Sequence, residues 1–102
     1  MSMLHTVNKS SYDRNTLETC VSLASKGSEV ILIEDGVYSA VKTGNKAGVI
    51  SDAMGDVNFY VLGPDLKARG LNEGQLIDGI KVVDYSGFVE LSVKNDKVTS
   101  WL

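Results

Sequence analysis

Cys20 has the most reactive side chain in this sequence, because it is the only thiol among the 102 residues. A cysteine can act as a nucleophile or carry sulfur when its thiolate is accessible at the working pH. The surrounding pattern places Cys20 in the middle of a helix, where the helix N-terminus would stabilise a thiolate very little. Its helical neighbours, such as Thr16 and Leu23, include no cation. Two interpretations therefore stay open: a functional thiol or a small buried side chain.

The remaining candidate ligands do not form a metal-binding set. His5 is the only histidine and lies between Leu4 and Thr6 in an apolar stretch. A metal site needs several His, Cys or carboxylate ligands at suitable spacing, which one histidine and one cysteine do not supply. We therefore expect neither a metal nor a cofactor, and a structural or interface role for His5. We expect Trp101, near the end of the chain, to pack in the core or at an interface.

Three acidic residues, Asp35, Asp65 and Asp84, each follow a predicted strand. In doubly wound folds ligands bind at this end of the sheet, so the three could form an acidic pocket. Each also stands at the start of a predicted helix, where a carboxylate can accept hydrogen bonds from free backbone amides. A phosphate- or nucleotide-binding module built around Asp35 and Asp65 is an alternative function. The stretch Gly44–Gly48 does not support it, because it lacks the spacing of a phosphate-binding loop.

Composition limits the class of protein. With 43% apolar and 23% charged residues and one proline, residues 1–102 are expected to form a single domain. One cysteine cannot close an internal disulfide, which fits a reducing compartment. The longest aliphatic run, Val30–Ile33, is far shorter than the roughly 20 residues of a membrane-spanning helix. The net charge of −3, with scattered Lys and Arg, argues against direct nucleic-acid binding. We expect a cytoplasmic protein without membrane contact.

Strand-like and helix-like segments alternate along the chain. The predicted strands are Met3–Val7, Glu29–Glu34, Val57–Leu62, Ile80–Val83 and Val98–Leu102. The predicted helical segments are Tyr12–Lys26, a turn over Val37–Val41, a short helix ending at Met54, another between Pro64 and Gly70, and one from Asp84 or Ser86 to about Asn95. In the first helix, apolar residues recur every three or four positions, and Gly27 marks its end. In the last, the spacing pairs Phe88 with Leu91 and Val89 with Val93.

This alternation predicts an α/β fold, namely a small doubly wound, mostly parallel five-stranded sheet with helices on both faces. Val30–Ile33 is apolar without alternation, which is typical of a central strand covered on both sides. The predicted helices are few and short, so they leave apolar sheet surface to be covered. We therefore expect partner subunits to complete the burial.

Several segments resemble one known family. They are Met3–Ser10 (MLHTVNKS), Glu34–Val37 (EDGV), Tyr60–Gly70 (YVLGPDLKARG), Val83–Val89 (VDYSGFV) and the closing Trp101. In this order and at this spacing they resemble the DsrH/TusB family over essentially the whole chain, residues 1–102.

The resemblance implies a subunit of a cytoplasmic sulfur-relay complex. Such a complex is a heterohexamer with two copies each of this chain, a DsrE/TusD-like subunit and a DsrF/TusC-like subunit. Thiol-bound sulfane sulfur passes onward to a DsrC/TusE-like carrier. The main persulfide cysteine lies on the DsrE/TusD-like subunit, so Cys20 would be a further persulfide-carrying or accessory thiol.

The two branches of the family differ in purpose. Dsr proteins serve the oxidation of stored sulfur, whereas Tus proteins supply sulfur for 2-thiouridine formation in tRNA. A cysteine at the position of Cys20 and the stretch Leu62–Gly70 look closer to DsrH, so a DsrEFH-type complex acting in intracellular sulfur oxidation is expected. The alternatives are a TusB-like subunit of the tRNA-thiolation complex and a purely structural subunit whose cysteine is inert.

Overall fold

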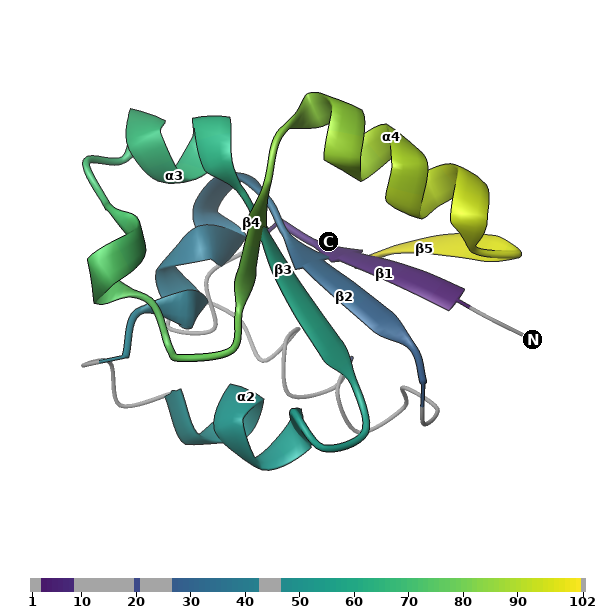
Figure 1. Ribbon diagram of the computed structural model, residues 1–102, viewed down its shortest axis with the longest axis horizontal. Helices are drawn as coiled ribbons and strands as arrows, with labels where there is room; N and C mark the ends of the chain where they lie inside the picture. The colour runs from purple at the N-terminus through teal and green to yellow at the C-terminus, as the bar shows by residue number, and fades with distance from the viewer. Residues whose placement is uncertain (1–2, 9–19, 21–26, 43–46, 102) are drawn as a thin grey trace.

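The computed structural model describes residues 3–8, 20, 27–42 and 47–101 and contains one five-stranded sheet (Figure 1). The strands are β1 (Met3–Val7), β2 (Glu29–Leu32), β3 (Asn58–Leu62), β4 (Lys81–Val83) and β5 (Lys97–Trp101). Their order across the sheet is β4-β3-β2-β1-β5, and every neighbouring pair is parallel. This confirms the predicted fold class, with a sheet that is parallel throughout.

Short helices connect the strands. They are the 3-10 helix η1 (Glu34–Ala40), α2 (Ala47–Ala53), α3 (Gly63–Ala68), the 3-10 helix η2 (Glu73–Gln75) and α4 (Tyr85–Lys94). Within the predicted helix Tyr12–Lys26, only Cys20 belongs to the described residues, and it is helical. No helix in the described part of the chain has the length and apolar character needed to cross a bilayer.

The segment after β2 differs from the prediction. The strand was expected to reach Glu34, but it ends at Leu32, and Glu34 starts a 3-10 helix that begins before the predicted Val37. Glu34 has a φ of 48°, a left-handed conformation that ends an extended strand. Two residues later the chain passes so close to β1 that a Cβ atom on Gly36 would lie 2.2 Å from the Val7 carbonyl oxygen. Only glycine fits there.

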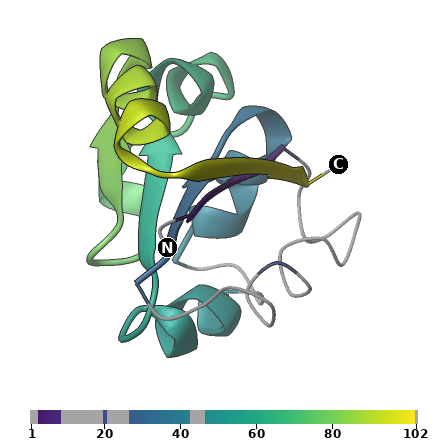
Figure 2. The ribbon, with the colours of Figure 1, turned by 90° about the vertical axis from the view of Figure 1, so that its right-hand side faces the viewer.

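The strand order explains which helices cover which face. The chain steps in one direction from β1 to β4 and then returns across the sheet to β5. Because parallel crossovers are almost always right-handed, the outward steps place their helices on one face and the return step on the other. Helices α2 and α4 accordingly lie on opposite sides of β1 and β5 (Figure 2).

Each face has its own buried cluster. On the side that we call the α2 face, strand residues pack with residues of η1, α2 and α3, and with Cys20; the members include Val7, Val30, Leu32, Phe59, Val61, Val37, Ile50 and Leu66. On the opposite side, the α4 face, Leu4, Ile31, Tyr60 and Leu62 pack with Leu91 of α4. Among the described residues, one ten-residue helix therefore covers the α4 face.

Helix α4 lies with one side against the sheet. Its N-cap Asp84 accepts a hydrogen bond from the Gly87 amide at 2.8 Å, as the capping prediction for this residue expected. Two apolar pairs at helical spacing were predicted in this helix. Phe88 and Leu91, the first pair, turn toward the sheet. Val89 and Val93 face outward and are 61% and 80% exposed.

Candidate functional site

Cys20 lies in the buried cluster on the α2 face. Its side chain is fully buried, and the cluster includes Val7 of β1 and Val30 and Leu32 of β2. Burial raises the pKa of the thiol to about 12, because a thiolate would lose its hydration there. In this conformation the group is a protonated, shielded thiol rather than an activated nucleophile.

His5 is buried on the same face, in the central part of β1. Side chains along a strand point alternately to its two faces. Leu4 belongs to the α4 face, so His5 points to the α2 face. In the strand register, His5 stands opposite Val30 of β2. The indole Nε1–H of Trp101 on β5 donates a hydrogen bond to His5 Nδ1 at 3.0 Å, with the ring centroids 6.0 Å apart. His5 thus has an internal structural partner, and Trp101 packs partly buried against the core.

Within the described part of the chain, the other ring nitrogen of His5, Nε2, has no hydrogen-bond partner. Burial lowers the pKa of His5, which favours the neutral imidazole. Since Nδ1 accepts from Trp101, the proton of the neutral ring is on Nε2. This Nε2–H is buried without a hydrogen-bond acceptor, in a side chain that is 3% exposed. Buried donors are nearly always paired, so this one calls for an explanation.

The carboxyl edge of β2 and β3 does not hold an open acidic pocket. Asp65 Oδ2 accepts from the Glu34 amide at 2.7 Å, and so caps η1 rather than its own helix α3. Asp35 forms a 2.9 Å ion pair with Arg69, which also donates to the Asp65 carbonyl. Arg69 thus bridges the Asp35 carboxylate and the Asp65 backbone carbonyl, while Asp84 caps α4 separately.

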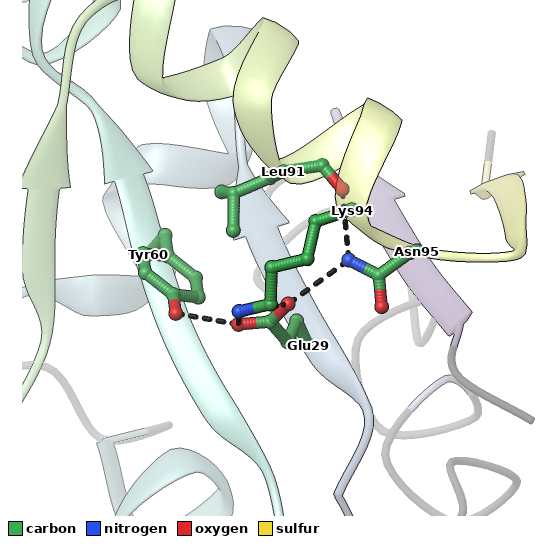
Figure 3. A network of polar contacts seen from close by, with 5 residues as sticks. All are labelled: Glu29, Tyr60, Leu91, Lys94 and Asn95. Carbon is green, nitrogen blue, oxygen red and sulfur yellow. Dashed lines mark hydrogen bonds and ion pairs between the residues drawn. The ribbon is translucent and has the colours of Figure 1, made fainter.

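A polar cluster on the α4 face was not predicted from the sequence. Glu29, buried at the start of β2, accepts a hydrogen bond from Tyr60 Oη at 2.5 Å and one from Asn95 Nδ2 at 2.9 Å (Figure 3). Lys94 Nζ lies 3.1 Å and 3.2 Å from the two carboxylate oxygens. Asn95 Nδ2 also donates to the Leu91 carbonyl at 2.8 Å. The cluster therefore ties the C-terminal end of α4 to the sheet.

These contacts set the charge states of the cluster. Burial acts to raise the pKa of Glu29, but hydrogen bonds from Tyr60, Asn95 and Lys94 outweigh it and hold the pKa below its ordinary value. The pKa of Tyr60 rises to about 12 through burial and the adjacent carboxylate. The available signal in the sequence was an acidic residue at the start of an otherwise apolar strand. Its partners lie 31, 65 and 66 positions further along, so no local pattern identified them.

No group of three or more His, Cys, Asp or Glu side chains within the described ranges could hold a metal ion. The glycine-rich stretch Gly44–Gly48 falls partly outside those ranges, since residues 43–46 are not described. The chemistry-bearing groups that remain are therefore the Cys20 thiol and the unpartnered His5 donor on the α2 face, and the Glu29 cluster on the α4 face.

Comparison with solved structures supports the fold. The crystal structure of the YchN protein of E. coli superposes with a TM-score of 0.75 at 16% identity, covering 99% of this chain and 100% of that one. MTH1491 of Methanobacterium thermoautotrophicum gives a TM-score of 0.70 at 21% identity, with 91% of each chain covered. At these identities the similarity concerns the fold alone.

Comparison of sequences defines the family. Residues 9–98 match the model of the family described as "DsrH like protein". The chain is 34% identical over 100 residues to "Protein TusB" of Pectobacterium parmentieri, covering 97% of this chain and all of that protein. It is 35% identical over 99 residues to "Protein TusB" of Escherichia coli, with the same coverage. These matches span nearly the whole chain, which therefore belongs to the DsrH-like family, with relatives named TusB.

Proposed function

We propose that this protein is a cytoplasmic sulfur-relay subunit that acts in a complex with fold-related TusC- and TusD-like subunits. The observation that carries the proposal is family membership over 97% of the chain. The proposed assembly contains two copies of each subunit and passes thiol-bound sulfane sulfur to a TusE-like carrier. The thinly covered α4 face, with Val89 and Val93 exposed on its single described helix, is consistent with burial against partners.

The biological role that we place first is sulfur supply for 2-thiouridine in tRNA. The curated relatives named TusB favour this branch over the sulfur-oxidation branch that the sequence motifs favoured. The DsrEFH-type role in sulfur oxidation is the second candidate, supported by the presence of Cys20. Deleting the gene in its host separates the two: loss of 2-thiouridine with intact sulfur oxidation is expected, and the reverse pattern would support the second candidate.

Within this complex we place Cys20 as an accessory site for sulfane sulfur, with the principal transfer thiol on the TusD-like subunit. Its burial and its pKa of about 12 support a sheltering role more than first attack on a donor. In the transfer step the Cys20 thiol gives its proton to the ionised persulfide of a partner, and the resulting thiolate attacks the outer sulfur of that persulfide. The partner's S–S bond breaks, a new S–S bond to Cys20 forms, and the partner leaves as a thiol, without net oxidation.

The test uses the full chain co-purified with its two partner subunits. Native mass spectrometry is expected to give a complex with equal copies of all three chains, and a stable monomer indifferent to the partners would overturn the proposal. After incubation with a sulfur donor, the intact mass of this chain is expected to rise by one sulfur atom in the wild type but not in Cys20→Ser. If the relay rate of Cys20→Ser equals that of the wild type and the chain gains no sulfur, the subunit is structural and the thiol inert.

A further inference from the structure

We propose that the buried Nε2–H of His5 is the hydrogen-bond donor that holds the sulfane sulfur carried by Cys20 as a persulfide anion. This inference rests on the proposed function of Cys20 and assigns His5 and Trp101 a place in it. The ligand class is a negatively charged terminal sulfur, which accepts hydrogen bonds.

The first argument is the state of His5. Trp101 donates to Nδ1 at 3.0 Å, which fixes the ring orientation and leaves the proton on Nε2. This donor is buried with no acceptor in a side chain that is 3% exposed. Leaving such a donor unpaired is unfavourable, so its retention is best explained by an acceptor that is present in another functional state.

The second argument is the direction of that donor. Nε2 is on the far side of the ring from the backbone, and alternation along β1 places the His5 side chain on the α2 face with Val7. Cys20 is buried on that face, in one cluster with Val7 and Val30. These two side chains flank His5, Val7 two residues along β1 and Val30 directly opposite on β2.

The third argument is the position of His5 in the strand order of the sheet. The strand order reverses at β1, since β2 lies on one side of it and β5 on the other. In open α/β sheets ligands bind at this switch point, outside the carboxyl ends of the strands, and Trp101 is the last residue of β5 at that end. His5 and Trp101 join β1 to β5 across it, and these strands lie side by side (Figure 2).

The persulfide anion on Cys20 requires a hydrogen-bond donor rather than a positive charge. When Cys20 takes sulfur from an ionised persulfide, the proton of the Cys20 thiol ends on the departing thiolate, which leaves as a thiol, and Cys20 keeps an S–S⁻ group. A neutral imidazole N–H stabilises this anion without giving up its own proton. Burial is the cause of the pKa shifts of both His5 and Cys20.

The experiment loads the full chain with inorganic polysulfide at a series of pH values and counts the added sulfur by intact mass. His5→Phe removes the donor, His5→Gln keeps an N–H at an equivalent position, and Trp101→Phe removes the group that orients the ring. Thr6→Val is the matched control, because Thr6 joins β1 to β5 on the opposite face through Ser100 Oγ at 3.2 Å. We expect His5→Phe to lower the persulfide fraction about tenfold and move half-loading up by about one pH unit. His5→Gln and Thr6→Val are expected to stay near the wild type, and Trp101→Phe to lie between.

Equal loading of His5→Phe and wild type would overturn the inference, as would equal loss in His5→Phe, His5→Gln and Thr6→Val. A second measurement needs no His5 variant. His5 is the only histidine, so ¹⁵N-histidine labelling of the chain follows this ring alone. The Nε2–H resonance is expected to shift on polysulfide loading in the wild type but not in Cys20→Ser, and an unchanged resonance would contradict the proposal.

The relay role of Cys20 can be disproved independently of the His5 inference. If Cys20 takes sulfur from polysulfide with the expected His5 dependence, but receives none from the partner subunits, the relay role of Cys20 is wrong and the His5 inference stands.

Discussion

The two faces of the sheet treat buried polar groups differently. On the α4 face, the buried Glu29 carboxylate receives hydrogen bonds from Tyr60, Asn95 and Lys94, and among the described residues the buried atom without a partner there, Asn95 Oδ1, is an acceptor. On the α2 face, His5 has one partner and a second nitrogen with none, in a cluster that also contains a lone buried thiol. A carboxylate with all these donors stabilises the fold. A buried donor without an acceptor costs stability, so its presence calls for an explanation.

The largest effect is expected from Glu29→Ala. It removes the acceptor of the buried Tyr60 hydroxyl, which would be left unpaired, and one of the two acceptors of the Asn95 amide, which keeps its hydrogen bond to the Leu91 carbonyl. We expect the free energy of unfolding to fall by about 3 kcal/mol, measured by urea denaturation. Tyr60→Phe removes one donor and keeps the ring, so a loss of about 1 kcal/mol is expected. If Glu29→Ala were as stable as the wild type, the cluster would not hold α4.

Stability as a function of pH distinguishes the faces. The pKa of Glu29 in the folded protein lies below its ordinary value of 4.5. Its contribution to the free energy of unfolding is therefore present above pH 4.5 and is lost as the pH falls toward the folded pKa. The folded pKa of His5 lies below 6.5, so its contribution is lost in a separate window below pH 6.5.

Two variants show which residue causes the loss of stability in each pH range. In thermal unfolding, Glu29→Gln is expected to remove the decline below about pH 4.5, and His5→Gln the decline that begins near pH 6.5. A wild-type profile that stays flat between pH 6.5 and pH 4.5 would contradict the state assigned to His5.

A smaller effect is expected from the cap of α4. Asp84→Ala removes the acceptor of the Gly87 amide and should lower the free energy of unfolding by about 1 kcal/mol. Asp84→Ser keeps a capping oxygen and should restore most of it. Hydrogen exchange of the first turn of α4 checks the location, and equal protection in all three proteins would show that the cap contributes little.

The smallest effect is expected from Lys94. Its side chain is 64% exposed, although the Glu29 side chain is 4% exposed. Solvent screens the pair on the lysine side, so Lys94→Ala should cost less than about 1 kcal/mol. Lys97→Ala on β5 serves as an exposed-lysine control. A loss for Lys94→Ala as large as that for Glu29→Ala would show that the ion pair, rather than the buried hydrogen bonds, holds the cluster.

The sequence by itself determined the order of the strands along the chain, the five-stranded α/β fold and the Asp84 cap of α4, but not the partners of Asp35 and Asp65. Apolar runs such as Val30–Ile33 and the Asp84 cap before α4 are local features, and local backbone preferences decide them. The motifs in the sequence and the comparison with family models both indicate the DsrH-like family. The spacing of Val89 and Val93 also predicted helix, but it could not tell that this pair faces outward.

Only the tertiary structure decided which side chains meet. Glu29 finds Tyr60 and Asn95 because β2, β3 and the end of α4 come together on one face. His5 meets Trp101, 96 positions away, because the chain returns across the sheet and β5 pairs with β1. Side chains far apart in sequence are brought into contact by strand order, and strand order depends on how the whole chain buries its apolar surface.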